Sequence, residues 1–290
     1  MMKKKMICLA ALMLCCACSK QEKLLIGGAG WQQIAIVDKK SGEVEWTHDL
    51  APDEECNDVD ITGSGDILYA YRQGVRLIRR DGATVWDYRA RENEEAYSAS
   101  VLASGDYLVA ISGMPARIVE LNERGETVKE VKFNTATFDI DRQFRRICKT
   151  PQNTYLVPLT YKHKISEISE EGRYLKSILC SGAPNSVTLA DDGNWIVSCG
   201  DTRRFLEINP ATKKIVKTVE TTSLNWGALL HVSELVRYKN GNTLIANSDM
   251  ESADKSQPKL LEVDSTNQIV WRMPYNPGVG NVTAVRSFFE

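Results

Sequence analysis

The sequence has few of the residues from which metal and catalytic sites are usually built. It contains three histidines, and its cysteines beyond residue 18 show neither a CxxC pair nor the Cys/His spacing of a zinc site. Paired carboxylates and a Ser/His/Asp order do not stand out, and "GGAG" at 27–30 lacks the helix that follows a phosphate loop. We therefore expect no metal and no cofactor.

The sequence also lacks a strong excess of charge of one sign, and it lacks long apolar runs after its N-terminal segment. Lysine and arginine are scattered among aspartate and glutamate, and the formal net charge is −2. The basic footprint of a nucleic-acid-binding protein is therefore absent. After residue 17 no segment approaches the ~18 consecutive apolar residues of a transmembrane helix. Helical periodicity is missing too, which argues against alternating strands and helices.

The N-terminal stretch "MMKKKMICLAALMLCCACSK" has the features of an export signal. A lysine-rich start precedes an apolar run that is too short to anchor the chain in a bilayer. The run ends in a sequence that resembles a bacterial lipobox, with Ala17 before Cys18, so we expect Cys18 to be lipidated. Cys15 stands where that pattern prefers leucine, which leaves Cys16 as a second acceptor. The alternative is a soluble secreted protein cut nearby.

A strand–turn–strand pattern recurs five times along the rest of the chain. Examples are "TGSGDILYAY" and "LASGDYLVAI", with glycine at the turn. The apolar residue three places after each turn recurs at intervals of 40, 48, 40 and 48 residues, at Leu68, Leu108, Leu156, Ile196 and Leu244. Further hairpins such as "RLIRRDGATVW" alternate with these. Four strands at a period of about 40–50 residues are typical of a β-propeller blade.

The two ends of the chain complete the ring in this interpretation. The first blade has material for three strands, so we assign Asn281–Phe289 as its innermost strand. Pairing the ends removes exposed edges. The expected fold is all-β: a six-bladed β-propeller with four antiparallel strands per blade. It spans residues 23–290, after a signal peptide of residues 1–17 and a lipid-anchored tether of residues 18–22.

The stretch "DKKSGEVEW", which ends at Trp46, resembles the D-x-x-[TS]-G-x-x-x-W repeat of quinoprotein-type (PQQ-like) propellers. Trp86 and Trp271 recur at the same place in their blades, and the resemblance implies that these tryptophans dock neighbouring blades. Quinoprotein dehydrogenases bind pyrroloquinoline quinone beside calcium and often have an adjacent cysteine pair. The adjacent pair here lies in the signal segment, so we expect no quinone.

The "NGNTLIAN" hairpin is similar to those of arylsulfotransferase-like propellers, which use a histidine nucleophile. His231 lies at the start of an innermost strand, so it is the candidate catalytic residue that this resemblance implies. His48 and His163 belong to blades one and four, and we expect them to lie apart from His231.

The inner strands align without gaps when eight residues are counted back from each turn. The second position is then polar and the third is apolar, as the two-residue period of a strand requires. We expect the polar set to face the central channel near its mouth; its members are Asp58, Ser98, Arg146, Ser186 and Glu234. The alternative is that these groups only hydrate the channel and pair with each other.

Three long connections fall at the end of the ring where the inner strands begin: "FNTATFDIDRQF", "TTSLNWGALLH" and "SDMESADKSQPK". Binding loops evolve where a chain tolerates growth, so we expect the functional face there. The expected ligand-binding residues are Asp58, Tyr97, Arg146, Trp226, His231 and Glu234. In the alternative, the loops only cap the ring and Trp226 is buried as a plug.

These features favour a binding module over an enzyme. We expect a monomeric lipoprotein of the bacterial cell envelope, facing the periplasm or the cell surface, that touches the membrane through its lipid anchor alone. Its loop-rich face would recognise a glycan, a peptide or a partner protein, and no nucleic acid. The rival interpretation is a transferase- or lyase-type enzyme with its site at the channel mouth.

Overall fold

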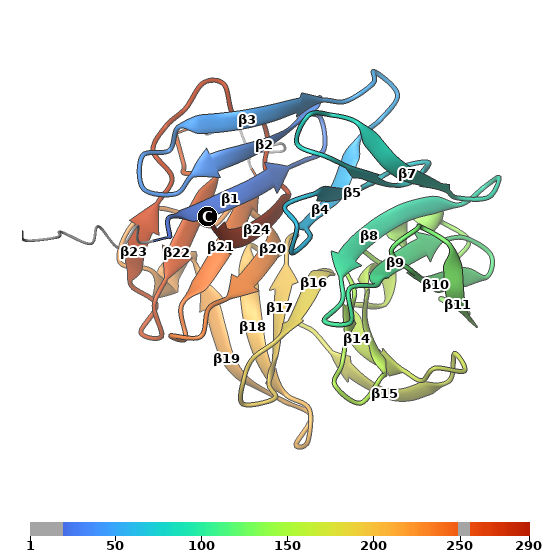
Figure 1. Cartoon of the computed structure of the whole chain (residues 1–290). Coiled ribbons are helices and arrows are strands. Elements are labelled where there is room, and N and C mark those ends of the chain that lie inside the picture. The colour runs from blue at the N-terminus through green and yellow to red at the C-terminus, as the bar shows by residue number, and fades with distance from the viewer. Residues whose placement is uncertain (1–19, 249–255) are drawn as a thin grey trace, which may run out of the picture.

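The computed structural model describes residues 20–248 and 256–290, which form six four-stranded antiparallel sheets (Figure 1). The sheets lie around a central axis and follow one another in chain order. The expected six-bladed β-propeller is therefore confirmed. The predicted signal peptide and the lipidation site Cys18 lie outside the described residues.

Each blade is ordered from its innermost to its outermost strand. Blade one is β24 (Ala284–Phe289), β1 (Glu22–Gly27), β2 (Gln33–Asp38) and β3 (Val44–Asp49). Blade two is β4 (Cys56–Ile61), β5 (Ile67–Tyr71), β6 (Gly74–Ile78) and β7 (Thr84–Arg89). Blade three is β8 (Glu95–Val101), β9 (Tyr107–Ser112), β10 (Ala116–Leu121) and β11 (Thr127–Phe133).

The remaining blades repeat this order. Blade four is β12 (Cys148–Lys149), β13 (Tyr155–Leu159), β14 (Lys164–Ile168) and β15 (Tyr174–Leu179). Blade five is β16 (Pro184–Leu189), β17 (Trp195–Cys199), β18 (Arg204–Asn209) and β19 (Lys214–Glu220). Blade six is β20 (His231–Arg237), β21 (Thr243–Ser248), β22 (Leu260–Val263) and β23 (Ile269–Arg272). Three 3-10 turns, at Ile140–Arg142, Thr160–Lys162 and Thr221–Ser223, are the helical elements of the described chain, and none of its helices could cross a membrane.

The repeated turn between the first and second strands of a blade needs a left-handed residue. Gly65 and Gly105 have φ of 89° and 92°, and Asn153 has φ of 59° at the same place in blade four. A Cβ at either glycine would meet nothing within 4 Å. Backbone conformation, rather than lack of room, therefore explains the glycine at these turns.

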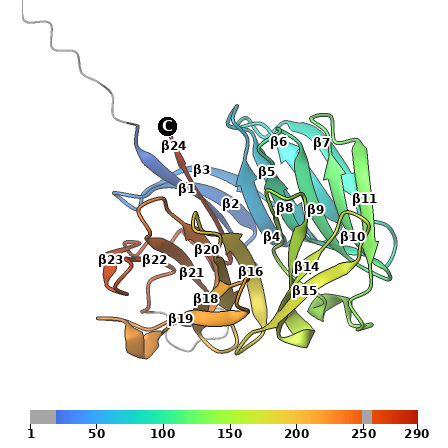
Figure 2. The same cartoon turned by 90° about the horizontal axis from the view of Figure 1, so that it is seen from below.

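The ring closes by pairing the two chain ends, as the sequence predicts. Strand β24 pairs with β1 from Gly27↔Ala284 to Glu22↔Phe289. Figure 2 shows β24 beside β1 from a second direction. The strand begins at Ala284, three residues later than expected from the sequence.

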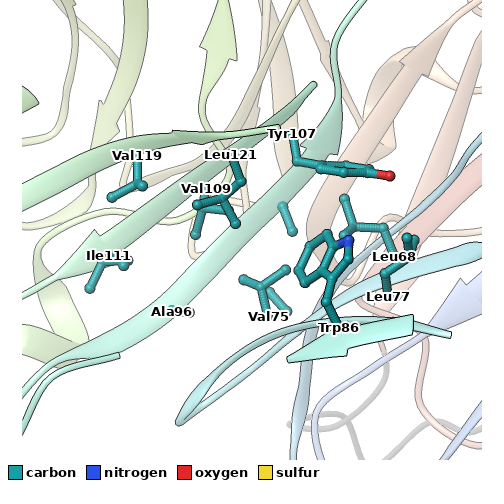
Figure 3. Packing of buried hydrophobic residues seen from close by; sticks show 12 residues of the cluster. Leu68, Val75, Leu77, Trp86, Ala96, Tyr107, Val109, Ile111, Val119 and Leu121 are labelled. Carbon is teal, nitrogen blue, oxygen red and sulfur yellow. The ribbon is translucent and has the colours of Figure 1, made fainter. Parts of the chain in front are cut away.

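The repeated tryptophans lie between blades. Trp46 Nε1 donates to the carbonyl of Arg80 at 2.7 Å, and Trp271 Nε1 donates to that of Lys39 at 3.0 Å. The Trp86 ring lies edge-on to that of Tyr107, with centroids 5.0 Å apart, in the apolar cluster between blades two and three (Figure 3). Each indole thus fixes one blade against the next, which matches the docking role that the repeat implies.

Candidate functional site

A cavity of about 620 Å³ opens at the end of the ring where the inner strands begin. Its wall is formed by the beginnings of the inner strands and by the connections between second and third strands. The lining residues in or just before the inner strands are Asn57, Tyr97, Arg145, Asn185, Ser233 and Thr283, and the connections contribute Arg72, Thr160, His163 and Asp201. All six blades contribute to this wall, at the face where the sequence predicts ligand binding.

A β-bulge directs one residue of most inner strands toward the cavity. The pairing register shifts between Cys56 and Asp58 in β4, and at the equivalent place in β8, β16 and β20. The extra residues line the cavity; they are Asn57, Tyr97, Asn185 and Ser233. A bulge leaves one residue outside the ladder and re-aims its side chain. The lining set is therefore one position earlier than the set that the sequence register selects.

The second-position residues instead join neighbouring inner strands. Asp58 Oδ2 accepts a hydrogen bond from the backbone N–H of Ala99 at 3.0 Å. Glu234 Oε2 accepts one from the backbone N–H of Val285 at 2.7 Å. In both cases the donor belongs to the next blade. These carboxylates satisfy backbone groups that no strand pairing reaches.

Three of the predicted ligand-binding residues form a buried ionic network. Arg146 Nε lies 3.1 Å from Asp58 Oδ1 and 3.4 Å from Glu234 Oε2. Arg286 of β24 also pairs with Glu234 and lies 3.7 Å from Asp58. The exposed fractions of Asp58, Glu234 and Arg146 are 0%, 3% and 6%. In the structure Arg146 therefore pairs with Asp58 and Glu234, as in the alternative in which the polar residues pair with each other.

Arg286 is a member of this network that the sequence reasoning missed. The inner strands were aligned by counting back from a glycine or asparagine turn, and β24 ends the chain without such a turn. Its pairing with β1 supplies the register that the count lacked.

Burial and the neighbouring Glu234 carboxylate raise the pKa of Asp58 to about 6. A carboxyl group with a raised folded-state pKa stabilises the fold fully below its unfolded pKa, and this contribution is lost as the pH rises through 6. Asp58→Asn stays neutral, so we expect its stability deficit relative to the natural protein to narrow between about pH 4 and pH 7. Urea unfolding at both pH values measures this, and a deficit that widens with pH would contradict the assignment.

Arg145 faces the cavity without a counter-charge in contact. Its guanidinium lies over the Tyr97 ring, with Cζ 4.2 Å from the centroid, and Nη1 donates to the carbonyl of Phe144 at 2.9 Å. Among the described residues no carboxylate oxygen lies within 4.0 Å of its nitrogen atoms. Burial lowers the pKa of Arg145, but an arginine remains charged at neutral pH. The remaining N–H donors can therefore bind an anionic group.

The acidic groups near Arg145 are already engaged. Tyr97 Oη lies 2.5 Å from Glu95 Oε2 and 2.7 Å from Asp141 Oδ1. Arg72 Nε lies 2.5 Å from Glu95 Oε1. The hydrogen bond with Tyr97 lowers the pKa of Asp141, whereas burial and the bond to Glu95 raise the pKa of Tyr97. The hydroxyl stays neutral and donates its one proton to Glu95 or Asp141, and Glu95 also pairs with Arg72, so both acidic groups have partners other than Arg145.

His231 lines the same cavity, at the start of β20. Its Nε2 lies 2.6 Å from Asn185 Nδ2, so the amide can donate to an unprotonated imidazole nitrogen. A Cβ at Gly200 would lie 2.2 Å from Nε2. Glycine at this position is therefore what allows the imidazole to occupy its place in the wall.

The other two histidines lie in different surroundings. His163 lines the same cavity as His231, but from the connection between β13 and β14 of blade four. His48 stacks on Trp46, with ring centroids 6.2 Å apart, away from the cavity lining. In residues 20–248 and 256–290 no group of three or more His, Cys, Asp or Glu side chains could hold a metal ion.

Trp226 lies outside the central cavity. Its side chain is 48% exposed and stacks on Arg272, whose Cζ lies 4.4 Å from the ring centroid. Both residues line a separate pocket of about 310 Å³ with Tyr275. The expected grouping of Trp226 with Asp58 is therefore corrected, and so is the alternative of a buried plug. The length of a connection indicates on which face of the ring it lies, but not how close its residues come to the central axis.

Comparison with known proteins places this ring among others of its kind. A family model described as Mal s 1 allergenic protein-like matches residues 28–259. A protein of unknown function from Bacteroides caccae is 34% identical, with a TM-score of 0.88 over 92% of this chain and 98% of that one. No curated protein matches the chain.

Two more distant structures share the fold alone. A catalytically inactive virginiamycin B lyase from Staphylococcus aureus, solved with quinupristin, is 12% identical, with a TM-score of 0.61 over 90% of this chain and 87% of that one. A chain of a nidogen/laminin complex is 12% identical, with a TM-score of 0.65 over 92% and 98%. One is an enzyme and the other is part of a protein complex, so the fold does not select between catalysis and binding.

Proposed function

The chain belongs to the Mal s 1 allergenic protein-like family, and we propose that it is a binding protein whose central cavity takes an acidic small molecule or an acidic sugar. The observation that carries the proposal is Arg145, which lines the cavity with no carboxylate of the described chain within 4.0 Å. An anionic group placed against it would receive charge-assisted hydrogen bonds, which are stronger in a half-buried site than in water.

The rest of the wall suits a ligand that also carries hydroxyl groups. Asn185, Ser233 and Thr283 present neutral donors and acceptors, and they come from three different blades. A volume of about 620 Å³ lies within the range of small-molecule sites. A glycan or peptide that ends in an acidic group would satisfy the same contacts.

The predicted export signal indicates where the protein would bind this ligand. Residues 1–17 would act as the signal peptide, and Cys18 would carry lipid at the start of the tether, residues 18–22. The protein would then present its cavity at the bacterial cell envelope. The "DKKSGEVEW" stretch supports a PQQ-like repeat used for blade docking, with no role for the quinone.

Anion binding should be lost in Arg145→Met with little change in stability, because the side chain is half-buried and makes no ion pair with a described carboxylate. We expect sulfate, compared with chloride at equal ionic strength, to raise the melting temperature of the natural protein. Sulfate should bind the variant at least tenfold more weakly, about 1.4 kcal/mol. Calorimetric titration measures this difference.

Arg79→Met is the matched control, because Arg79 is an exposed arginine in the turn between β6 and β7. Its sulfate response should equal that of the natural protein. An equal response in all three proteins would show that Arg145 is not the anion site.

A lyase- or transferase-type enzyme is the second candidate, and the position of His231 favours it. The imidazole lies in the same cavity as Arg145 and contacts Asn185. A histidine beside a bound anion could exchange a proton with it. Conversion of the bound compound by the natural protein, lost in His231→Ala, would favour the enzyme over the binding protein.

A further inference from the structure

A second pocket, of about 310 Å³, lies at the outer strand of blade six. It is formed where three connections meet: the one between β19 and β20, the one between β21 and β22, and the one between β23 and β24. Among the described residues, none lines both this pocket and the central cavity. The pocket is therefore a separate place on the loop-rich face at which a ligand can bind.

Two exposed aromatic side chains and one arginine form the walls of this pocket. Trp226 is 48% exposed and Tyr275 is 83% exposed. The Arg272 guanidinium stacks on the indole, with Cζ 4.4 Å from the ring centroid. Tryptophan, tyrosine and arginine are the residues in which binding energy is most often concentrated at recognition surfaces. The pocket therefore has the composition of a recognition site.

The donors of Arg272 are available to a ligand. Its side chain makes no hydrogen bond or ion pair with another described residue. Stacking on the indole fixes the plane of the guanidinium, and its N–H groups point outward along the edge of that plane. The described lining of the pocket contains no aspartate or glutamate. A carboxylate placed at this edge would accept two parallel hydrogen bonds from the arginine.

Hydrogen bonds within the protein hold the connections that carry these side chains. Gln257 Oε1 accepts from the backbone N–H of Ala228 at 2.9 Å, and Asn276 Nδ2 donates to the carbonyl of Gly42 at 3.1 Å. Met273, which also lines the pocket, is 5% exposed and packs in the apolar cluster between blades six and one. A supported pocket loses less loop entropy when a ligand binds.

We propose that this pocket is a second binding site and that it takes an acidic pyranose, such as a uronic acid unit of a glycan. The C–H groups of the sugar ring would pack against the exposed rings of Trp226 and Tyr275, and its carboxylate would pair with Arg272. A volume of about 310 Å³ is at the lower end of the range of small-molecule sites, which suits a single sugar unit. This site is independent of the ligand proposed for the central cavity.

Calorimetric titration with a tetramer of galacturonic acid tests this site, in the natural protein and in Arg145→Met. We expect binding in both, because Arg145 belongs to the central cavity. Trp226→Ala or Arg272→Gln, each added to Arg145→Met, should weaken binding by about tenfold or more. Both side chains are exposed, so the melting temperature should stay the same. A tetramer of galactose lacks the carboxylates and should bind about tenfold more weakly than the acidic tetramer.

Tyr161→Ala is the matched control. Tyr161 is an exposed aromatic residue with Arg142 over its ring, Cζ 5.3 Å from the centroid, but it is not in the described lining of this pocket. Its replacement should leave the affinity unchanged. Absence of binding, unchanged affinity in Trp226→Ala and Arg272→Gln, equal binding of the two tetramers, or tighter binding of benzoate would overturn the assignment. Failure of the central-cavity proposal would appear instead as equal sulfate binding by the natural protein and Arg145→Met.

Discussion

Removal of residues 281–290 is expected to leave a chain that cannot form a stable ring. These residues contain β24, the innermost strand of blade one, which pairs with β1 through six residue pairs. Ala284 and Val285 are fully buried, so their apolar neighbours would become exposed to water. An open edge beside apolar side chains favours aggregation.

Circular dichroism melting and size-exclusion chromatography measure this loss. Removal of Glu290 alone is the control, because its half-exposed ion pair with Arg80 should contribute little. We expect that shorter truncation to melt close to the natural temperature. If the ten-residue truncation also did so as a monomer, β24 would not be needed to close the ring.

Arg146→Met is expected to lower the free energy of unfolding by about 3–5 kcal/mol, because it leaves Asp58 and Glu234 buried without one of their two arginines. Methionine keeps much of the side-chain length, so lost charge is the main change. For a protein of this size the melting temperature should fall by roughly 10 °C. Urea unfolding gives the free energy directly.

The neighbouring Arg145→Met is the matched control for this change. Both arginines lie beside the cavity, but only Arg146 contacts buried carboxylates among the described residues. We expect Arg145→Met to unfold near the natural urea concentration. Equal destabilisation by the two variants would mean that the ionic network does not hold the inner strands together.

The fold could be predicted in full because its signals are local and repeated. Five of the six blades have a glycine or asparagine turn three residues before an apolar strand residue, and the closing strand of blade one is the one segment left unpaired. Trp46 and Trp271 could also be placed between blades, because their position relative to the turn is the same in each copy.

The site could be predicted only to within one residue along the inner strands. The gap-free alignment identifies the positions of Asp58 and Glu234, but a β-bulge just before each of them turns the preceding residue toward the cavity. The bulge recurs at the same position in four of the five aligned strands, so the alignment needs no gap there and does not reveal it. The pair "RR" at 145–146 therefore drew attention to Arg146, whereas Arg145 is the arginine without a described carboxylate partner.

Long-range geometry explains the other differences. The length of its connection places Trp226 on the correct face, yet the distance of Trp226 from the axis depends on how that connection folds. Arg286 could not be aligned, because its strand ends the chain instead of turning.

Capture of small molecules on the purified protein tests the central claim most directly. Immobilised natural protein and Arg145→Met would be incubated with envelope extract, washed and eluted, and the eluted compounds identified by mass spectrometry. The account predicts acidic compounds of low mass that are enriched on the natural protein at least tenfold over the variant. Equal recovery from both proteins, or enrichment of neutral compounds alone, would contradict the assignment of the cavity as an acidic-ligand site.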